Sequence, residues 1–322
     1  MKFNSLVLKN SFIVAALQSL WLSTGLLADT FGGGAFSIDF VAIGNAGNTD
    51  DSSGFGGVNY NYRIGKYEVS RGMISDYNSL SGGPTITLAD MTSQGGNGLN
   101  RPATGVSWNE AARFVNWLNT SSGHSVAYNF VTAGANDYIG VWSASDPGFD
   151  VTNPYRNQNA YYFLPSEDEW YKAAYYDPSL NGGAGGYWDY ATGSNAAPTS
   201  VVSGNSPGTA VFGHSLSTGP ADILNSGGLS PYGTMAQGGN VWERIESDFI
   251  LPNDDPTEFH TIRAGYWGNV GSSLSSESRV SNSRAIDSSL TGFRVASIPE
   301  LSSSMLMVLG AAFVALCRRR SQ

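Results

Sequence analysis

Cysteine and histidine are nearly missing from this 322-residue chain. The single cysteine, Cys317, lies within the last six residues. One cysteine excludes an intramolecular disulfide framework, a thiolate zinc cluster and an iron–sulfur site. The three histidines, His124, His214 and His260, lie far apart and lack the spacing of metal ligands. We expect them to be ordinary surface residues.

Charge and long apolar runs are also scarce. Charged residues make up 13% of the chain, about half of the usual fraction of about 25%. No apolar run reaches the roughly 20 residues of a standard spanning helix, and the mean hydropathy is -0.16. These values exclude a multi-pass membrane protein. With 17 basic and 26 acidic residues, the net charge is -9, which repels phosphate backbones, so we expect no nucleic-acid partner.

Aromatic residues and glycine are abundant by contrast. The chain holds 8 Trp, 16 Tyr, 15 Phe and 40 Gly. Disordered chains usually combine few aromatics with high net charge. The composition therefore predicts a folded protein with aromatic packing and long polar loops.

The N-terminal residues have the features of a secretory signal. Lys2 and Lys9 precede an apolar stretch over residues 12–27, and Ala28 stands before the first acidic residue, Asp29. This order predicts a signal peptide over residues 1–28 and export of the rest. A buried N-terminal helix is the alternative.

The C-terminal residues 298–322 also look like an address. Pro299 and Glu300 precede an apolar run over residues 305–316, and three arginines follow at 318–320. Twelve helical residues cover only about 18 Å of a hydrocarbon core of about 30 Å. This tripartite tail resembles the bacterial PEP-CTERM sorting signal, although Leu301 replaces the second proline. The resemblance implies exosortase-type sorting machinery as a partner, membrane attachment through the tail, and a location at the cell surface, anchored or extracellular.

The body, residues 29–297, is predicted to be one α+β domain. Ser107 with Glu110, and Ser166 with Glu169, are capping boxes that begin amphipathic helices. Ser70 begins a weaker third helix. Alternation over residues 60–69 and the short run 291–296 predict strands. Few short helices among Gly-rich segments favour the α+β class.

Common catalytic motifs are missing from the sequence. It contains no GxSxG elbow, Walker loop, HExxH helix or complete Rossmann glycine pattern. The acidic cluster at residues 167–169 is explained by its place in a first helical turn. The oxygen-rich loop 45–51 lacks the spaced ligands of a calcium loop, and an ordinary turn is the preferred interpretation.

Six segments occur in an order that resembles the formylglycine-generating enzyme family, also called sulfatase-modifying factors. They read IGKYEVS, PATGVSWNEAARFVNWLN, FLPSEDEWYKAA, SPYGTMAQGGNVWER, IRAGYWGN and TGFRVA, at residues 64–70, 102–119, 163–174, 230–244, 262–269 and 291–296. The resemblance covers about residues 40–297. It implies an α+β fold that is a C-type-lectin-like variant with little regular secondary structure.

The residues for the family's copper chemistry are not in place. Active aerobic members use two cysteines to bind copper, and the aligned positions here are Asn269 and Leu274. Neither side chain can supply a thiolate. We therefore expect no copper, no catalytic residues of that type and no formylglycine-generating oxidase activity.

The resemblance also implies a structural calcium site. Gly239 and Val241 match positions that offer backbone carbonyls, and Glu243 matches a carboxylate ligand. Ala236 stands where an Asn or Asp ligand is usual, which weakens such a site. The alternative role of Glu243 is a buried carboxylate bonded to backbone amides. Arg294 matches the family and is expected to be a core ion-pair or hydrogen-bond residue.

Further departures from the family pattern are Phe163 for arginine, Arg244 for tryptophan, Ala264 for glycine and Tyr266 for serine. Together with the missing thiolates they favour a binding or structural module that contacts an extracellular polysaccharide or protein. The alternative is an enzyme of the same family with a different, non-thiolate active site. Carboxylates with shifted pKa values around a pocket would favour the enzyme.

Overall fold

The computed structural model describes residues 27–131, 139–250, 253 and 259–298. The predicted sorting tail from Pro299 onward lies outside these residues, as does the predicted signal peptide up to residue 26. Within the described part, no helix is both long enough and apolar enough to cross a membrane.

A five-stranded antiparallel sheet brings the two ends of the described chain together. Its order is β1 (Leu27–Phe31), β2 (Phe36–Ile43), β3 (Tyr62–Gly65), β15 (Ala296–Ser297) and β6 (Tyr162–Phe163). The C-terminal strand β15 lies between β3 and β6, so β6 is joined to the N-terminal strands only through the C-terminal end of the described chain.

The six segments that resemble the family do not include the whole of this sheet. Strands β1 and β2 precede them and form a hairpin that the sequence did not predict. Asp29 of β1 accepts hydrogen bonds from Arg63 Nη1 (3.0 Å), Arg63 Nη2 (2.6 Å) and the Tyr162 hydroxyl (2.8 Å). The predicted domain start at residue 29 thus lies inside β1, at a residue that ties β1 to β3 and β6.

A second sheet is formed by β13 (Val280–Asn282), β12 (His260–Arg263), β11 (Trp242–Asp248) and β14 (Thr291–Phe293), in that order. Strands β11 and β14 are parallel, and the other pairs are antiparallel. Only Arg294 and Val295 separate β14 from β15 of the first sheet. The predicted strand 291–296 is therefore two strands, because the chain passes here from one sheet to the other.

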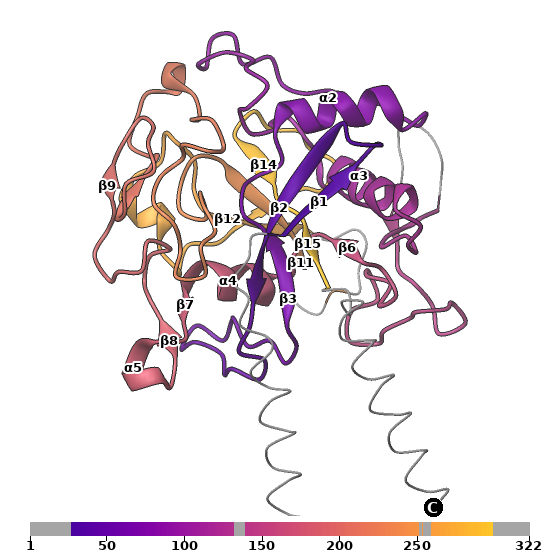
Figure 1. The fold of residues 1–322 in the computed structure, drawn as a ribbon, viewed down its shortest axis with the longest axis horizontal. Coiled ribbons are helices and arrows are strands. Elements are labelled where there is room, and N and C mark those ends of the chain that lie inside the picture. Colours follow the sequence, from indigo (N-terminus) through magenta and orange to yellow (C-terminus); the bar gives the residue numbers. More distant parts are fainter. Residues whose placement is uncertain (1–26, 132–138, 251–252, 254–258, 299–322) are drawn as a thin grey trace, which may run out of the picture.

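The three predicted helices are confirmed: α2 (Arg71–Leu80), α3 (Trp108–Ser121) and α4 (Glu167–Tyr175). Ser107 Oγ accepts from Glu110 N (3.2 Å) and Ser166 Oγ accepts from Glu169 N (3.3 Å), as the capping boxes require. Figure 1 shows α2 and α3 on one side of the β1–β2 hairpin, with β7, β8 and β9 on the opposite side.

The remaining elements are short and separated by irregular chain, in agreement with the expected α+β class. They are β4 (Asn129–Phe130), β5 (Ile139–Gly140), β7 (Tyr176–Asp177), α5 (Leu180–Gly183), β8 (Gly186–Tyr187), β9 (Thr199–Ser200), β10 (Thr209–Ala210), η2 (Leu216–Thr218) and η3 (Gly271–Leu274).

The main core lies between α3 and the first sheet. The predicted stripe of α3, formed by Ala111, Phe114, Val115 and Leu118, is fully buried. Phe114 packs edge-to-face on Phe293 of β14, with ring centroids 5.7 Å apart. Burying such a side chain contributes about 1.5–3 kcal/mol.

The predicted strand over residues 60–69 is much shorter in the structure. Only Tyr62–Gly65 pair as β3, and all four residues are buried. The chain then leaves the sheet, and Val69 N donates to Phe293 O (2.9 Å) of β14. This change of direction places Glu68 inside the molecule. The alternating pattern of residues 60–69 therefore does not correspond to one buried and one exposed face of a strand.

Candidate functional site

Glu243, the predicted carboxylate ligand, lies at the start of β11 and is fully buried. Its Oε2 accepts hydrogen bonds from Trp170 Nε1 (2.7 Å) and Arg294 Nε (2.5 Å). Its Oε1 accepts from Arg294 Nη2 in the same ion pair. Both carboxylate oxygens are therefore bound by side-chain donors, and not by the backbone amides named as the alternative.

Arg294 is confirmed as a core ion-pair residue. Its Nη1 donates to Gly65 O (2.9 Å) and Lys66 O (3.3 Å), and its Nη2 donates to Met235 O (2.8 Å). The guanidinium is fully buried with every nitrogen bonded. A buried charge is tolerated when it is paired and hydrogen-bonded in this way.

The other two predicted calcium ligands lie next to Glu243 but are tightly enclosed. Gly239 has a φ of +107°, and a Cβ at this position would lie 2.5 Å from Val211 O. Val241 is fully buried. Across the described ranges, no group of three His, Cys, Asp or Glu residues could hold a metal ion. The guanidinium of Arg294 is bonded to both carboxylate oxygens of Glu243, so neither oxygen is free to bind a calcium ion. In this arrangement the carboxylate does not fit as a calcium ligand. The calcium site stays a prediction.

The two positions predicted to align with the copper cysteines have structural contacts. Asn269 Oδ1 accepts from Tyr266 N (2.9 Å), and Asn269 O accepts from Gly213 N (2.9 Å). Leu274 ends η3 and is 1% exposed. Asn269 thus holds a turn, and Leu274 fills a packed interior.

The expectation that all histidines are surface residues is wrong for His260. It is 1% exposed on β12 and stacks on Trp108, with ring centroids 4.2 Å apart and an interplanar angle of 4°. Its Nδ1 lies 2.8 Å from Glu246 O. Burial disfavours the imidazolium and lowers the pKa of His260 to about 3. His124 and His214 are half-buried.

The acidic cluster at the start of α4 does more than cap a helix. Glu167 is buried and pairs with both Arg263 and Arg279, whose Nη2 atoms lie 2.5 and 2.8 Å from its oxygens. Helix capping explained the place of these carboxylates in the sequence but not their partners, which lie about a hundred residues away in the chain.

Glu169 completes its capping box and also forms a buried ion pair. Arg156 Nη2 lies 2.8 Å from Glu169 Oε2, and Arg156 Nε lies 2.8 Å from Glu246 Oε2. The same guanidinium stacks 3.8 Å above the Phe163 ring. An arginine charge is thus present beside Phe163, the position where the resemblance expects an arginine.

An open hollow of about 420 Å³ lies beside the oxygen-rich loop. It is lined by residues 47–52 and 184–187 together with Tyr176. Asp50 Oδ1 accepts from Gly57 N (2.7 Å), and the Tyr187 hydroxyl donates to Thr49 O (2.9 Å). The loop is a turn, as expected, but its amide, hydroxyl and carboxylate groups also line a surface hollow. No pattern in the sequence indicates that hollow, because its second wall comes from residues 184–187 and Tyr176, which are distant in the chain.

Comparison with known proteins identifies the class of this α+β domain. The model of the sulfatase-modifying factor enzyme 1-like domain, FGE-sulfatase, matches residues 48–298. The match covers most of the chain, so the chain belongs to this family. No curated protein matches it.

Three solved structures share the fold. Treponema denticola variable protein 1 has a TM-score of 0.57 at 17% identity, over 85% of this chain and 100% of its own. The corresponding values for CarF are 0.55, 19%, 82% and 99%. Those for PvdO from Pseudomonas aeruginosa are 0.51, 15%, 85% and 98%. At these identities the likeness is one of fold alone.

The Glu243–Arg294 pair predicts a large effect of one substitution. Glu243→Gln leaves Arg294 buried without a carboxylate, and we expect the free energy of unfolding to fall by about 3–5 kcal/mol. Urea unfolding measures this loss, and the exposed Glu277→Gln is the control. We expect the same loss with calcium and with chelator. A parent protein whose Tm rises with calcium, beside a variant that does not respond, would establish the predicted calcium site.

Asp168 predicts a pH dependence of stability. Burial raises its pKa to about 6, with Asp50 adding to the shift and the Gly56 N–H opposing it. The native state therefore binds this proton more tightly than the unfolded chain, so ionised Asp168 costs stability above pH 6, and that cost vanishes by about pH 4. We expect Asp168→Asn to raise the free energy of unfolding at pH 7.5 by about 1–3 kcal/mol and to match the parent near pH 4. Asp189→Asn is the exposed control. An equal gain at both pH values contradicts the assignment.

Proposed function

We propose that this protein is an exported, surface-anchored member of the family that acts as a binding or structural module and lacks formylglycine-generating oxidase activity. The observation that carries the proposal is the pair Asn269 and Leu274 at the aligned thiolate positions. One holds a turn through its side chain and the other is packed in the interior. Soft copper ligation needs thiolates, which these residues do not have.

The hollow beside residues 47–52 supports a ligand rich in hydroxyl groups. Asn48, Thr49 and Asp50 bring an amide, a hydroxyl and a carboxylate to its wall, and Tyr176 and Tyr187 add phenol rings. Such a mixture of aromatic surface and hydrogen-bonding groups suits a sugar. We therefore infer a neutral extracellular polysaccharide as the ligand, because Asp50 and Asp51 would repel an acidic one.

Within the α+β class, we propose that the fold is a C-type-lectin-like variant. Few helices, short strands and long irregular segments support it. A lectin-like fold is compatible with a binding role, but fold alone does not establish function. The local hollow carries that part of the proposal.

One experiment tests both parts of the proposal, the missing oxidase activity and the binding of a neutral polysaccharide. Purified full-length protein is incubated with a cysteine-containing sulfatase peptide, copper and oxygen, and in parallel is run in affinity gels containing dextran or alginate. We expect no formylglycine by mass spectrometry and retardation by dextran. Ser52→Trp places a bulky side chain at the exposed edge of the hollow and should abolish retardation, whereas Ser145→Trp on a distant exposed loop should not. Formylglycine in the product would establish the enzyme instead.

Anchoring through the tail predicts a change of location on truncation. Deleting residues 299–322 removes the apolar run and its arginines, while every described strand remains. We expect the protein to move from the membrane fraction to the medium in cells that carry out the sorting. Continued membrane association of the truncated chain would show that another segment is the anchor.

A further inference from the structure

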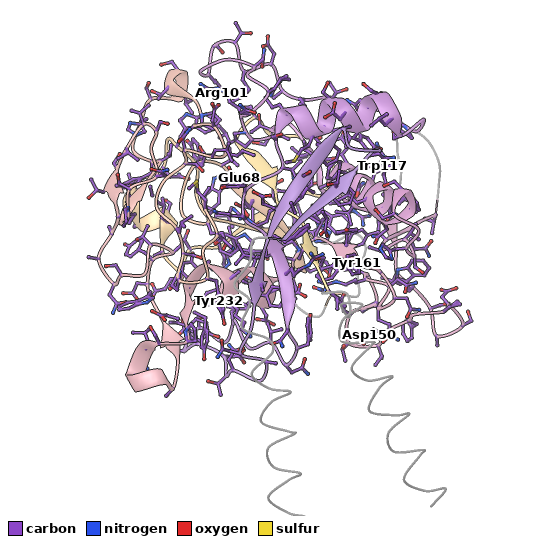
Figure 2. The ribbon with its side chains drawn as sticks, viewed as in Figure 1. Glu68, Arg101, Trp117, Asp150, Tyr161 and Tyr232 are labelled. Atoms are coloured by element: carbon purple, nitrogen blue, oxygen red, sulfur yellow. The ribbon has the colours of Figure 1, made fainter. Side chains whose placement is uncertain are left out.

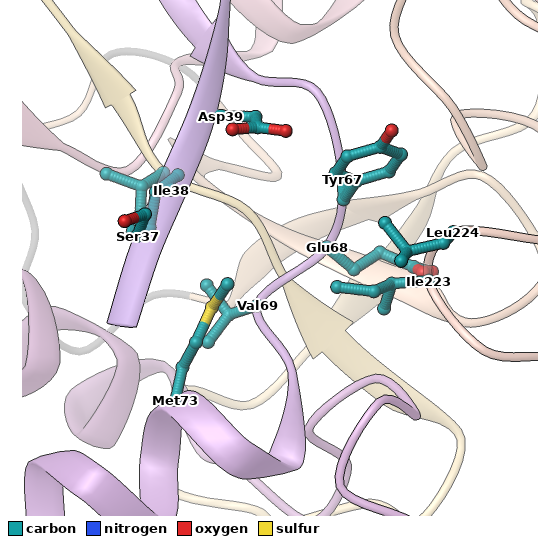
Figure 3. Close-up of a pocket in the computed structure, with 10 residues that line it drawn as sticks. Ser37, Ile38, Asp39, Tyr67, Glu68, Val69, Met73, Ile223 and Leu224 are labelled. Atoms are coloured by element: carbon teal, nitrogen blue, oxygen red, sulfur yellow. The ribbon is translucent and has the colours of Figure 1, made fainter. Parts of the chain in front are cut away.

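A second cavity, separate from the hollow, lies between β2, the start of α2 and the loop after Ala221. Its volume is about 120 Å³. The walls are mostly apolar, from Ile38, Val69, Met73, Ile223 and Leu224. Leu224 is 49% exposed, so the cavity opens to the surface on that side. Figure 3 shows these side chains with the carboxylates of Asp39 and Glu68.

Glu68 is an unusual residue for such a wall. It is 1% exposed, and Figure 2 shows it in the middle of the molecule. Its Oε2 accepts from Asn240 Nδ2 (2.7 Å). Its Oε1 is buried and accepts no hydrogen bond of good geometry among the described residues, although the Val241 N–H lies near enough to the carboxylate to lower its pKa. A buried polar atom without a partner is costly, and in native structures it calls for a ligand, an ion or water.

The charges around the cavity do not balance. Asp39 and Glu68 line it, and no lysine, arginine or histidine does. The nearest buried cation, Arg294, has its guanidinium committed to Glu243 and to three backbone carbonyls. Burial and the neighbouring Glu243 raise the pKa of Glu68 well above its usual value, and they outweigh the Arg294 charge and the hydrogen bonds from Asn240 and Val241, which lower it. A cation bound at Oε1 would offset both effects.

We propose that this cavity binds a primary ammonium group at the end of a short aliphatic chain. The ammonium donates to Glu68 Oε1, and the methylene groups lie against Met73, Ile223 and Leu224. The half-buried Asp39 attracts the same charge from the cavity wall. A lysine side chain has this combination of apolar stem and compact charged head.

A metal ion fits the cavity less well. Hard cations take six to eight oxygen ligands, whereas most of this wall is hydrocarbon. An aliphatic ammonium satisfies the carboxylate and the apolar wall together. The group can come from a lysine of a partner protein or from a free alkylamine, since both present the same chemistry.

The test uses the full-length protein and n-butylammonium chloride as the probe. We expect the Tm to rise with probe concentration at pH 7.5, and isothermal titration to give one site per chain. Neutral 1-butanol, which has the same stem, should bind at least about tenfold more weakly, because a hydrogen bond to a charged group contributes about 1.5–3 kcal/mol. Equal binding of butanol would overturn the proposal.

Variants locate the probe in the cavity. Glu68→Gln should weaken binding at least about tenfold by the same argument, whereas the exposed Glu277→Gln should bind like the parent. Leu224→Trp alters a half-exposed side chain at the opening and should block entry while preserving the fold, so the proposal stays testable if Glu68→Gln does not fold. Undiminished binding by Leu224→Trp would contradict the site.

A second probe distinguishes the two sources of the ammonium group, a lysine of a partner protein and a free alkylamine. Nα-acetyl-lysine methylamide carries the ammonium on a peptide unit, and tighter binding than butylammonium would favour a lysine of a partner protein. Weaker binding would favour a free amine. Both results support the site, whereas failure of both compounds to bind the parent would refute it.

Discussion

The buried pair between Arg294 and Glu243 is the interaction on which the two sheets depend. Arg294 lies in the two-residue step from β14 to β15, and Glu243 is the second residue of β11, the neighbour of β14. The guanidinium also bonds Gly65 O at the end of β3. It has five N–H donors in a fixed plane, which lets one side chain bind a carboxylate and several carbonyls at once. The same residue therefore joins both sheets and neutralises Glu243.

The interior around α4 also contains buried ion pairs between arginine and glutamate side chains. Glu167 is held by Arg263 and Arg279, and Glu169 by Arg156. Burial alone would raise the pKa of Glu169, but the charge and hydrogen bonds of Arg156 outweigh burial and lower it. A chain with so few charged residues thus places many of them inside. A buried ion pair adds little net stability, but breaking it leaves an uncompensated buried charge and is costly. Arrangements of the segments that separate the partners are therefore disfavoured.

Local signals in the sequence predicted local structure well. The serine caps of α3 and α4 were readable because a capping box needs only residues three positions apart. The burial of His260 could not be predicted from its neighbours in the sequence, because it depends on Trp108, which lies far away in the chain. The β1–β2 hairpin was missed for a related reason, since its first strand begins inside the segment that also has the features of a signal peptide. Arg294 was assigned correctly only through the family resemblance, and its partner Glu243 was given a different role.

Two departures from the family pattern show how the scaffold and the chemistry separate. Ala264 replaces an expected glycine and Ala236 an expected Asn or Asp, all residue types that tolerate the left-handed backbone region. Both alanines nevertheless have positive φ angles, +88° and +66°. An alanine in this region costs about 1–2 kcal/mol, so the backbone takes this path at positions where glycine or asparagine would be less strained. Surrounding contacts hold these strained positions: Gly239 N donates to Ala264 O (2.7 Å), and Met235, the neighbour of Ala236, accepts from Arg294 through its carbonyl (2.8 Å). Long-range hydrogen bonds and ion pairs thus hold the backbone at positions where the local residue type does not favour its conformation.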